Sequence, residues 1–382
     1  MLVVSGAVVV VLAFALVVCR ASFGWFFPVA SGSMEPTIKT GEIVFLRYDD
    51  GVPDRYDIVA FTDVGGGASV KRVLGLPNEA IVIEPTGDVR IEGRLLRDDP
   101  QRPGLIPIFD SRLQSIGEHW RHGGTLVDPW SLVDGAEPGP DEVWAMDGSA
   151  VGRGAALGLL ALHDRVDDGR LLPCGERVAG NHTVHDVAVA FEVRVLEPGG
   201  RLRVQLVEQG DVFEASAPVY AGELDSRVDV FRTTPDGIDY LDYGRATIPL
   251  GEWIPVRFSN VDDRLELEIG DARMSVEYDR NSPHPSSRTT EPVSLGERVR
   301  LGGEGIVMQV RSILVERDLH VVPRGSFGVG RTLLLGPDEI YVVGDASSSS
   351  RDSRDRGPVE LDRVFGRVEA VVWPLDGFRR VP

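Results

Sequence analysis

Cysteine and histidine are scarce in this sequence. Its 382 residues include two cysteines, Cys19 and Cys174, which stand far apart, and seven histidines. So wide a spacing argues against a disulfide framework. His182 and His185 lie close together, but two histidines without further ligands do not make a zinc site. The sequence therefore predicts neither a metal site nor a bound cofactor.

Positive charge is also in short supply. Lysine and arginine number 40 against 59 aspartates and glutamates, which gives a formal net charge of −19. This balance excludes nucleic acid as a partner, because a phosphate backbone calls for a basic face. An acidic surface instead keeps a protein soluble. The apolar fraction of 42% suffices for a packed core, and the length fits two or three domains.

The sequence has one long apolar run, at its N-terminus. Residues Leu2–Val18 carry no charge and are mostly Val, Ala and Leu, and their length is near the lower limit for a spanning helix. Arg20 ends the run, and aromatic residues of the kind found at the lipid headgroup level follow it: Phe23, Trp25, Phe26 and Phe27. We expect residues 1–20 to form a single transmembrane anchor in the bilayer of the plasma or inner membrane.

A cleavable signal peptide is the alternative interpretation of this run. No basic segment precedes it, and Val18 is larger than a lipoprotein site requires before Cys19. Charge says little about orientation, because Arg20 is the only basic residue nearby. We place the N-terminus inside the cell and the rest of the chain outside the cytoplasm, because the chemistry inferred below belongs there.

Beyond residue 30 the sequence is typical of β structure. Short apolar runs bounded by Gly, Pro and Asp, such as Glu42–Arg47, indicate an antiparallel all-β domain. Similar runs return near the C-terminus at Glu339–Val343 and Val364–Trp373. We therefore expect a mainly β fold in which one antiparallel domain is split between residues 30–96 and residues 320–382.

The residues between these two pieces form an insertion of two parts. Residues 97–185 look like an irregular connection, with a helix or loop at Ala155–Leu162. Residues 186–319 contain about eight short strands, which indicates a β-sandwich or jelly roll. The run Trp253–Asp271 resembles concanavalin-like or laminin-G-like sandwiches. Such folds bind sugars or serve as spacers, so a glycan or protein ligand of this part is left open.

Ser33 can act as a nucleophile if a base lies near it. A neutral serine hydroxyl attacks an amide slowly and needs a partner that removes its proton. Histidine is the usual base, but none is near the stretch Ser31-Gly32-Ser33-Met34-Glu35-Pro36-Thr37. A lysine can serve when burial lowers its pKa from about 10.4. Lys71 fits, because side chains alternate along its expected strand and place Lys71 and Arg72 on opposite faces, so that one can be buried while the other stays in water.

These stretches resemble bacterial-type signal peptidase I, a membrane-bound protease with a Ser/Lys dyad. The serine stretch, the run Lys71-Arg72-Val73-Leu74-Gly75-Leu76-Pro77 and the loop Gly344–Arg354 follow one another as in that family. The resemblance implies that Ser33 is the nucleophile and Lys71 the general base. It also implies that Ser31, with the backbone N–H of Ser33, stabilises the oxyanion.

The C-terminal loop holds the supporting residues that the resemblance implies. Ser350 would orient Lys71, and Asp352 would form an ion pair with Arg354. The loop departs from the family at Ala346-Ser347-Ser348-Ser349, where Asn and charged residues are usual. This departure puts the rigidity of the loop in question.

We therefore expect a membrane-bound serine endopeptidase that removes signal peptides from exported preproteins and works outside the cytoplasm. The alternative is a membrane-anchored carbohydrate- or protein-binding module carried on an inactive peptidase scaffold. A Ser/Lys peptidase dedicated to one substrate, such as a pilin, would show the same sequence pattern.

Overall fold

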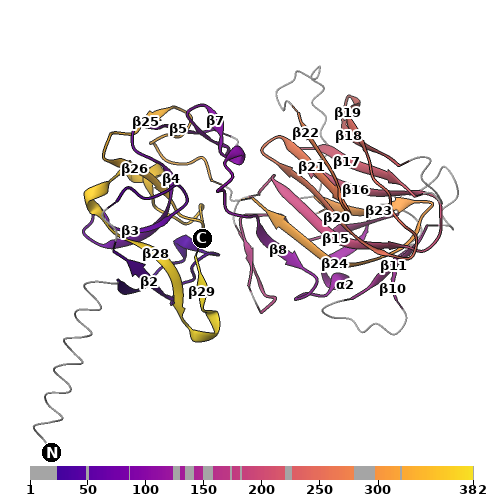
Figure 1. Cartoon of the computed structure of the whole chain (residues 1–382), viewed down its shortest axis with the longest axis horizontal. Coiled ribbons are helices and arrows are strands. Elements are labelled where there is room, and N and C mark those ends of the chain that lie inside the picture. The colour runs from indigo at the N-terminus through magenta and orange to yellow at the C-terminus, as the bar shows by residue number, and fades with distance from the viewer. Residues whose placement is uncertain are drawn as a thin grey trace, which may run out of the picture. The chain divides into compact units, whose positions relative to one another are not determined.

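The computed structural model describes residues 24–48, 51–85, 87–123, 130–133, 142–148, 158–172, 174–180, 183–219, 226–278, 297–318 and 321–381. The expected membrane anchor at residues 1–20 lies outside these ranges. Among the described residues, no helix is both long and apolar enough to span a membrane. The chain forms two compact units, the first made of residues 1–103 and 319–382 and the second of residues 104–318 (Figure 1). The expectation of a mainly β protein is confirmed.

The first unit is built on an antiparallel sheet whose strands come from both ends of the sequence (Figure 1). The strand order is β1-β2-β28-β3-β4-β26-β27, and β29 pairs with β28. The bounds are β1 Trp25–Pro28, β2 Ile43–Arg47, β3 Ile58–Thr62, β4 Ala68–Gly75, β26 Glu339–Val343, β27 Val359–Glu360, β28 Val364–Trp373 and β29 Arg379–Arg380. Because β28 lies between β2 and β3, neither piece of the sequence completes this sheet alone.

Both faces of this sheet are covered, which explains its apolar runs. Val44, Ile58 and Val70 belong to one core cluster. Their neighbours along the strands, such as Val59 and Val73, belong to another cluster. Side chains alternate between the faces of a strand, so two covered faces produce a continuous apolar sequence rather than an alternating one.

A smaller sheet completes the first unit. Its order is β25-β5-β6-β7, with bounds β5 Ala80–Ile83, β6 Val89–Ile91, β7 Arg94–Leu95 and β25 Leu333–Leu334. The remaining short elements are η1 Gly32–Met34, η2 Leu96–Asp98, α3 Ser353–Arg356, η4 Leu361–Arg363 and η5 Leu375–Gly377. Two of these turns, η1 and α3, carry or flank the predicted site residues.

The second unit consists of two large antiparallel sheets that share one core. One has the order β10-β11-β24-β15-β20-β21-β22, with β8 paired to β24, and the other the order β19-β18-β17-β16-β23-β12-β9. The first sheet comprises β8 Ile106–Asp110, β10 Trp130–Leu132, β11 Trp144–Asp147, β15 Val187–Val195, β20 Trp253–Val261, β21 Arg264–Ile269, β22 Ala272–Glu277 and β24 Val307–Arg317. The second comprises β9 Trp120–Gly123, β12 Gly158–Leu162, β16 Arg201–Glu208, β17 Asp211–Pro218, β18 Arg227–Thr234, β19 Gly237–Arg245 and β23 Val299–Glu304. Helix α2 (Ile116–His119) and the pair β13 Arg170–Leu171 and β14 Arg177–Val178 lie outside both sheets.

The predicted irregular connection at residues 97–185 is wrong. From residue 104 onward this part belongs to the second unit, and it supplies strands to both large sheets. The predicted helix or loop at Ala155–Leu162 is, from Gly158 onward, the strand β12, whose five residues are all buried. A strand that is covered on both faces has no alternation, so its sequence resembles a buried helical segment.

Candidate active site

Ser33 lies in η1, a single turn that follows β1. The side chain of Met34 is buried in the core of the first unit and anchors the turn there. The backbone is fixed as well, since Ser33 O accepts a hydrogen bond from Ala346 N at 3.1 Å. The nucleophile turn and the C-terminal loop therefore contact each other directly, although the two are far apart in the sequence.

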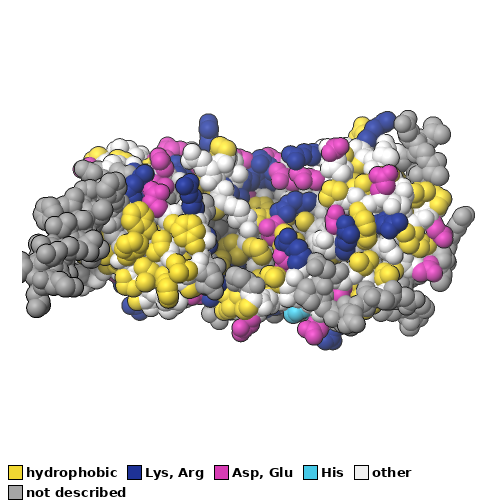
Figure 2. Space-filling model, turned by 60° about the horizontal axis from the view of Figure 1, so that its bottom comes forward, with side chains coloured by type: hydrophobic (Ala, Val, Ile, Leu, Met, Phe, Trp, Pro, Cys, Tyr) yellow, Lys and Arg dark blue, Asp and Glu magenta, His cyan; other side chains and the backbone are white. Residues whose placement is uncertain are grey.

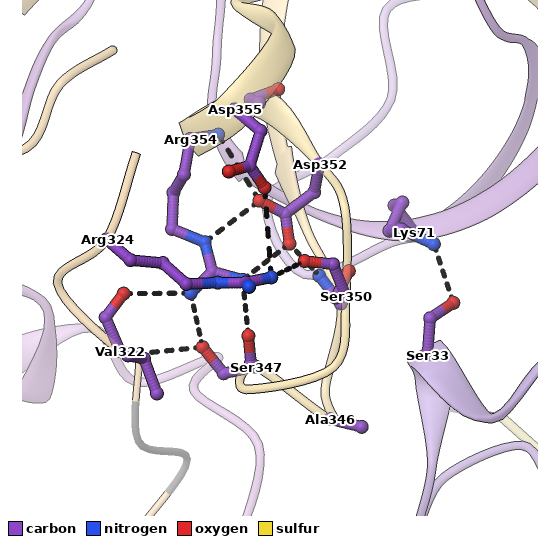
Figure 3. Close-up of polar contacts among 12 residues, drawn as sticks. Ser33, Lys71, Val322, Arg324, Ala346, Ser347, Ser350, Asp352, Arg354 and Asp355 are labelled. Carbon is purple, nitrogen blue, oxygen red and sulfur yellow. Dashed lines mark hydrogen bonds and ion pairs between the residues drawn. The ribbon is translucent and has the colours of Figure 1, made fainter. Parts of the chain in front are cut away.

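Lys71 reaches Ser33 from the central strand β4. Its Nζ donates to Ser33 Oγ at 2.7 Å and to Val70 O at 2.9 Å (Figure 3). Strand β4 pairs with β3, where Val59 stands opposite Lys71. Only 4% of Lys71 is exposed. The structure thus brings the two predicted catalytic residues within hydrogen-bond distance of each other.

Burial is the main influence on the ionisation of Lys71. Removal from water lowers the pKa of the Lys71 amine from 10.5 to about 8, against the opposing pull of the Asp352 and Asp345 carboxylates. The positive charge of Arg354 adds to the lowering. With this pKa, a useful fraction of the amine is neutral near neutral pH, and a neutral amine can accept the proton of a hydroxyl.

Ser31 lies on the exposed side of the nucleophile. It precedes η1 with an extended backbone, and its Oγ stands 3.4 Å from Ser33 Oγ. A hydroxyl in this place can donate to an oxygen that develops negative charge when Ser33 attacks a carbonyl. The position of Ser31 therefore fits the oxyanion role that the sequence resemblance implies.

A hydrogen-bond network beside the dyad joins Arg72, Asp345 and Thr37. Arg72 is buried as well as Lys71, with 2% exposed, so the expected contrast in burial between them is not found. Asp345 Oδ1 and Oδ2 accept from Arg72 Nε at 2.8 Å and Nη2 at 2.7 Å. Asp345 Oδ2 also accepts from Thr37 Oγ1 at 2.5 Å. One carboxylate thus links the nucleophile segment to the strand that carries the base. Sequence reasoning gave these residues no role, although all three lie in the motifs that it singled out.

The ion pair between Asp352 and Arg354 is entirely buried, with both side chains 0% exposed. Arg354 Nε donates to Asp352 Oδ1 at 2.9 Å, and Arg354 Nη2 donates to Asp352 Oδ2 at 2.7 Å. Gly344 N also donates to Asp352 Oδ2, at 3.0 Å. Burial alone would raise the pKa of Asp352, but the hydrogen bonds and charge of Arg354, helped by Gly344, hold it below its usual value.

Ser350 does not make the contact that was expected of it. Within the described residues, Lys71 Nζ bonds to Ser33 and Val70, and no well-aligned hydrogen bond reaches the buried Ser350 Oγ. The hydroxyl is close enough to Asp352 to help lower the pKa of that carboxyl. A Cβ on Gly344 would stand only 2.2 Å from Ser350 Oγ, so glycine is needed for this approach.

Ser347 lies in the part of the loop that departs from the family pattern. Its Oγ accepts from Arg354 Nη1 at 2.6 Å and from Val322 N at 2.8 Å. Its carbonyl oxygen accepts from Arg354 Nη2 at 2.8 Å. The turn closes through Ser350 N and Ala346 O at 3.0 Å. The substituted serine is therefore itself part of the buried network.

Comparison with known proteins gives two matches, each of which covers part of the chain. Residues 2–104 match the family model described as signal peptidase, peptidase S26. The mitochondrial ATP-independent inner membrane protease subunit 1b of Arabidopsis thaliana is 28% identical over 109 residues. That alignment covers 25% of this chain and 64% of the relative, so the chain spans less than two thirds of the relative's length. Both matches support a peptidase, and hence a hydrolase.

Some solved structures also match the chain, at low sequence identity. A Bacillus subtilis protein of unknown function with a galectin-like fold is 9% identical, with 56% of this chain and 96% of that chain covered and a TM-score of 0.37. The carbohydrate-binding module CBM66 of Bacillus subtilis is 10% identical, with 50% and 97% covered and a TM-score of 0.28. Sheep galectin-11 is 12% identical, with 42% and 96% covered and a TM-score of 0.25. Scores this low decide nothing about function.

Proposed function

We propose that this protein is a membrane-bound serine endopeptidase that removes signal peptides from exported preproteins by means of a Ser33/Lys71 dyad. The observation that carries the proposal is the 2.7 Å contact between Lys71 Nζ and Ser33 Oγ. The lowered pKa of the same lysine supports it. A hydroxyl beside a buried amine that can be neutral is the arrangement that nucleophilic catalysis by serine requires.

The reaction follows from the positions of these groups. Ser33 Oγ bonds to the carbonyl carbon of the substrate while its proton passes to Lys71 Nζ. Ser31 Oγ and the Ser33 N–H stabilise the oxyanion. The C–N bond then breaks as Lys71 returns the proton to the leaving amine. A water molecule, deprotonated by Lys71, hydrolyses the acyl–Ser33 ester and restores the enzyme.

An exposed apolar surface supports a membrane location. Figure 2 shows hydrophobic side chains gathered on one face of the first unit. Strand β1 and the C-terminal end of β28 with the turn after it contribute large exposed side chains: Trp25, Phe26, Trp373, Leu375 and Phe378. Both strands pair with β2. A patch of this kind marks a membrane or protein interaction site, and its aromatic residues suit the headgroup level of a bilayer.

Replacing Ser33 tests the proposal. The full-length Ser33→Ala protein is expected to lose preprotein cleavage, while a Ser349→Ala protein, altered at an exposed serine of the C-terminal loop, keeps it. The measurement is the release of the mature N-terminus from a preprotein in detergent or vesicles, read by mass spectrometry. Cleavage at the wild-type rate by both Ser33→Ala and Lys71→Ala proteins would exclude the dyad. A dedicated peptidase would differ from a general one in cleaving a single preprotein of a panel.

Glycan binding by the second unit is a second candidate function. Tyr240 and Tyr243 are exposed on the outermost strand β19, and the Arg227 guanidinium lies 5.4 and 4.7 Å from their ring centroids. Exposed aromatic faces beside charged groups suit the apolar face and hydroxyls of a sugar. A Tyr240→Ser/Tyr243→Ser protein is expected to lose binding on a glycan array that wild type and an Ile238→Ser control retain. An array on which wild type itself binds nothing would remove this candidate.

A further inference from the structure

The first described residues after the second unit run directly along the supporting ion pair. The second unit ends at Asp318, and we define the return segment as Val321–Phe327. We propose that the return segment is a positioning element for Lys71, acting through the buried pair Asp352–Arg354. The inference rests on the proposed function, since it assigns a role to residues that support its general base.

Val322 joins the return segment to the guanidinium of Arg354. Arginine has five N–H donors, and in Arg354 all have acceptors. Three go to Asp352 and to the carbonyl of Ser347. The other two go to Ser347 Oγ and to Val322 O, the latter at 2.8 Å. Val322 N in turn donates to Ser347 Oγ at 2.8 Å, so both backbone polar groups of Val322 are used in this one network.

The following residues enclose Arg354 from the backbone side. Ser326 N and Phe327 N donate to Arg354 O at 2.8 and 3.1 Å. Gly325 has a φ of +99°, and a Cβ there would stand 2.2 Å from the same carbonyl oxygen. Only glycine permits both the backbone conformation and the close approach. The segment therefore follows Arg354 closely over several consecutive residues.

Arg324 extends the contact to Ser350. Its Nη2 donates to Ser350 O, and the same nitrogen lies 3.7 Å from the Asp355 carboxylate. Figure 3 shows Arg324 beside Arg354, on the side of the loop away from the dyad. Arg324 is only half-buried, so its replacement leaves the core of the unit intact. It is therefore the contact of the return segment that can be removed most cleanly.

A loosened return segment would favour the protonated form of the Lys71 amine. The Asp352 carboxylate favours the protonated amine, and Arg354 opposes it. If Arg354 moves away from Asp352, this opposition weakens. Water that enters the loosened loop also favours the charged amine. Both changes reduce the neutral fraction of the base at neutral pH, and the reaction slows.

The test compares two variants with two controls in the full-length protein. Arg324→Ala and Ser347→Ala remove contacts of the network. Arg380→Ala and Ser349→Ala make the same replacements at exposed positions of the first unit. The readout is the NMR titration of the Lys71 side chain after ¹³C-lysine labelling. Because the sequence contains only two lysines, Lys39 and Lys71, a Lys71→Met spectrum assigns the signal.

We expect the midpoint of the Lys71 titration to rise by about one pH unit in both variants and to stay unchanged in both controls. One unit leaves about tenfold less neutral amine at pH 7, and preprotein cleavage at that pH should fall in proportion. Arg324→Lys, which keeps a positive donor, should restore most of the midpoint. If Ser347→Ala does not fold, Arg324→Ala decides alone.

A Lys71 midpoint that is the same in Arg324→Ala and in wild type would overturn the inference, because the segment would then be purely structural. The titration needs no substrate. It therefore separates the inference from the proposed function: a wild-type protein that cleaves no preprotein defeats the proposed function, while the Lys71 midpoints still decide the role of the return segment.

Discussion

Replacing Lys71 by methionine is expected to abolish proteolysis and at the same time to stabilise the protein at neutral pH. Loss of a general base costs about 10²–10⁴ in rate. The stabilisation has a separate cause. Because the pKa of the amine falls from 10.5 to about 8 on folding, burial of its protonated form costs about 3 kcal/mol. Methionine has a similar length and carries no charge, so the variant avoids this cost.

The pH dependence of stability gives this prediction its control. Between pH 8 and 10.5 the unfolded state holds the Lys71 proton and the folded state has lost it, so the stability of wild type rises with pH in this window. The Lys71→Met protein lacks this contribution, while a Lys39→Met protein retains it. Urea unfolding at a series of pH values measures the difference. A Lys71→Met protein that is less stable than wild type at pH 7, or that still cleaves preprotein, would contradict the account.

Removing the side chain of Arg354 is expected to destabilise the first unit by about 3–5 kcal/mol, the usual cost of leaving one member of a buried ion pair without its partner. The Asp352 carboxylate would keep its hydrogen bond from Gly344 N but would lose both bonds from the guanidinium. Its pKa, now held low mainly by Arg354 against the effect of burial, should rise in the Arg354→Ala protein.

Hydrogen exchange of the β4 and β26 amides measures this loss in the first unit separately from the second. A double variant, Asp352→Leu with Arg354→Met, is the matched control. It removes both charges together and should recover most of the stability, although not the activity. Arg331→Ala, at an exposed arginine, should change little. A loss below about 1 kcal/mol in Arg354→Ala, the range of a surface pair, would show that the pair is not structurally important.

Much of the site could be predicted because its residues stand in short motifs. Ser33 and Lys71 each occupy a segment whose local sequence sets a turn or a strand, and the structure brings their side chains together. The Asp352–Arg354 pair needs only one residue between its members. In contrast, Lys71 and Arg72 were expected to differ in burial, because alternation along a strand assumes one exposed face. Here both faces are covered, and distant partners, Asp345 and the carbonyl of Tyr56, make the burial of Arg72 possible.

The remaining errors come from information that is not local. Strands β17 and β19 have weak strand signals in their sequences. Strand β17 contains Asp, Glu, Ala and Pro, which are depleted in strands, although Phe213, Ala215 and Ala217 enter the core. Strand β19 is the outermost strand of its sheet and has no clear apolar alternation. The role of the return segment was equally hidden, because it depends on backbone contacts with Arg354, which leave no sequence pattern.

The most direct test of the central claim is the pH titration of the Lys71 amine in the full-length protein. If Lys71 is the base, its titration midpoint lies at about 8, the cleavage rate rises with pH through the same value, and the signal is absent from Lys71→Met. A midpoint near 10.5, the value for an amine in water, would mean that Lys71 is charged throughout the physiological range and cannot take the proton of Ser33.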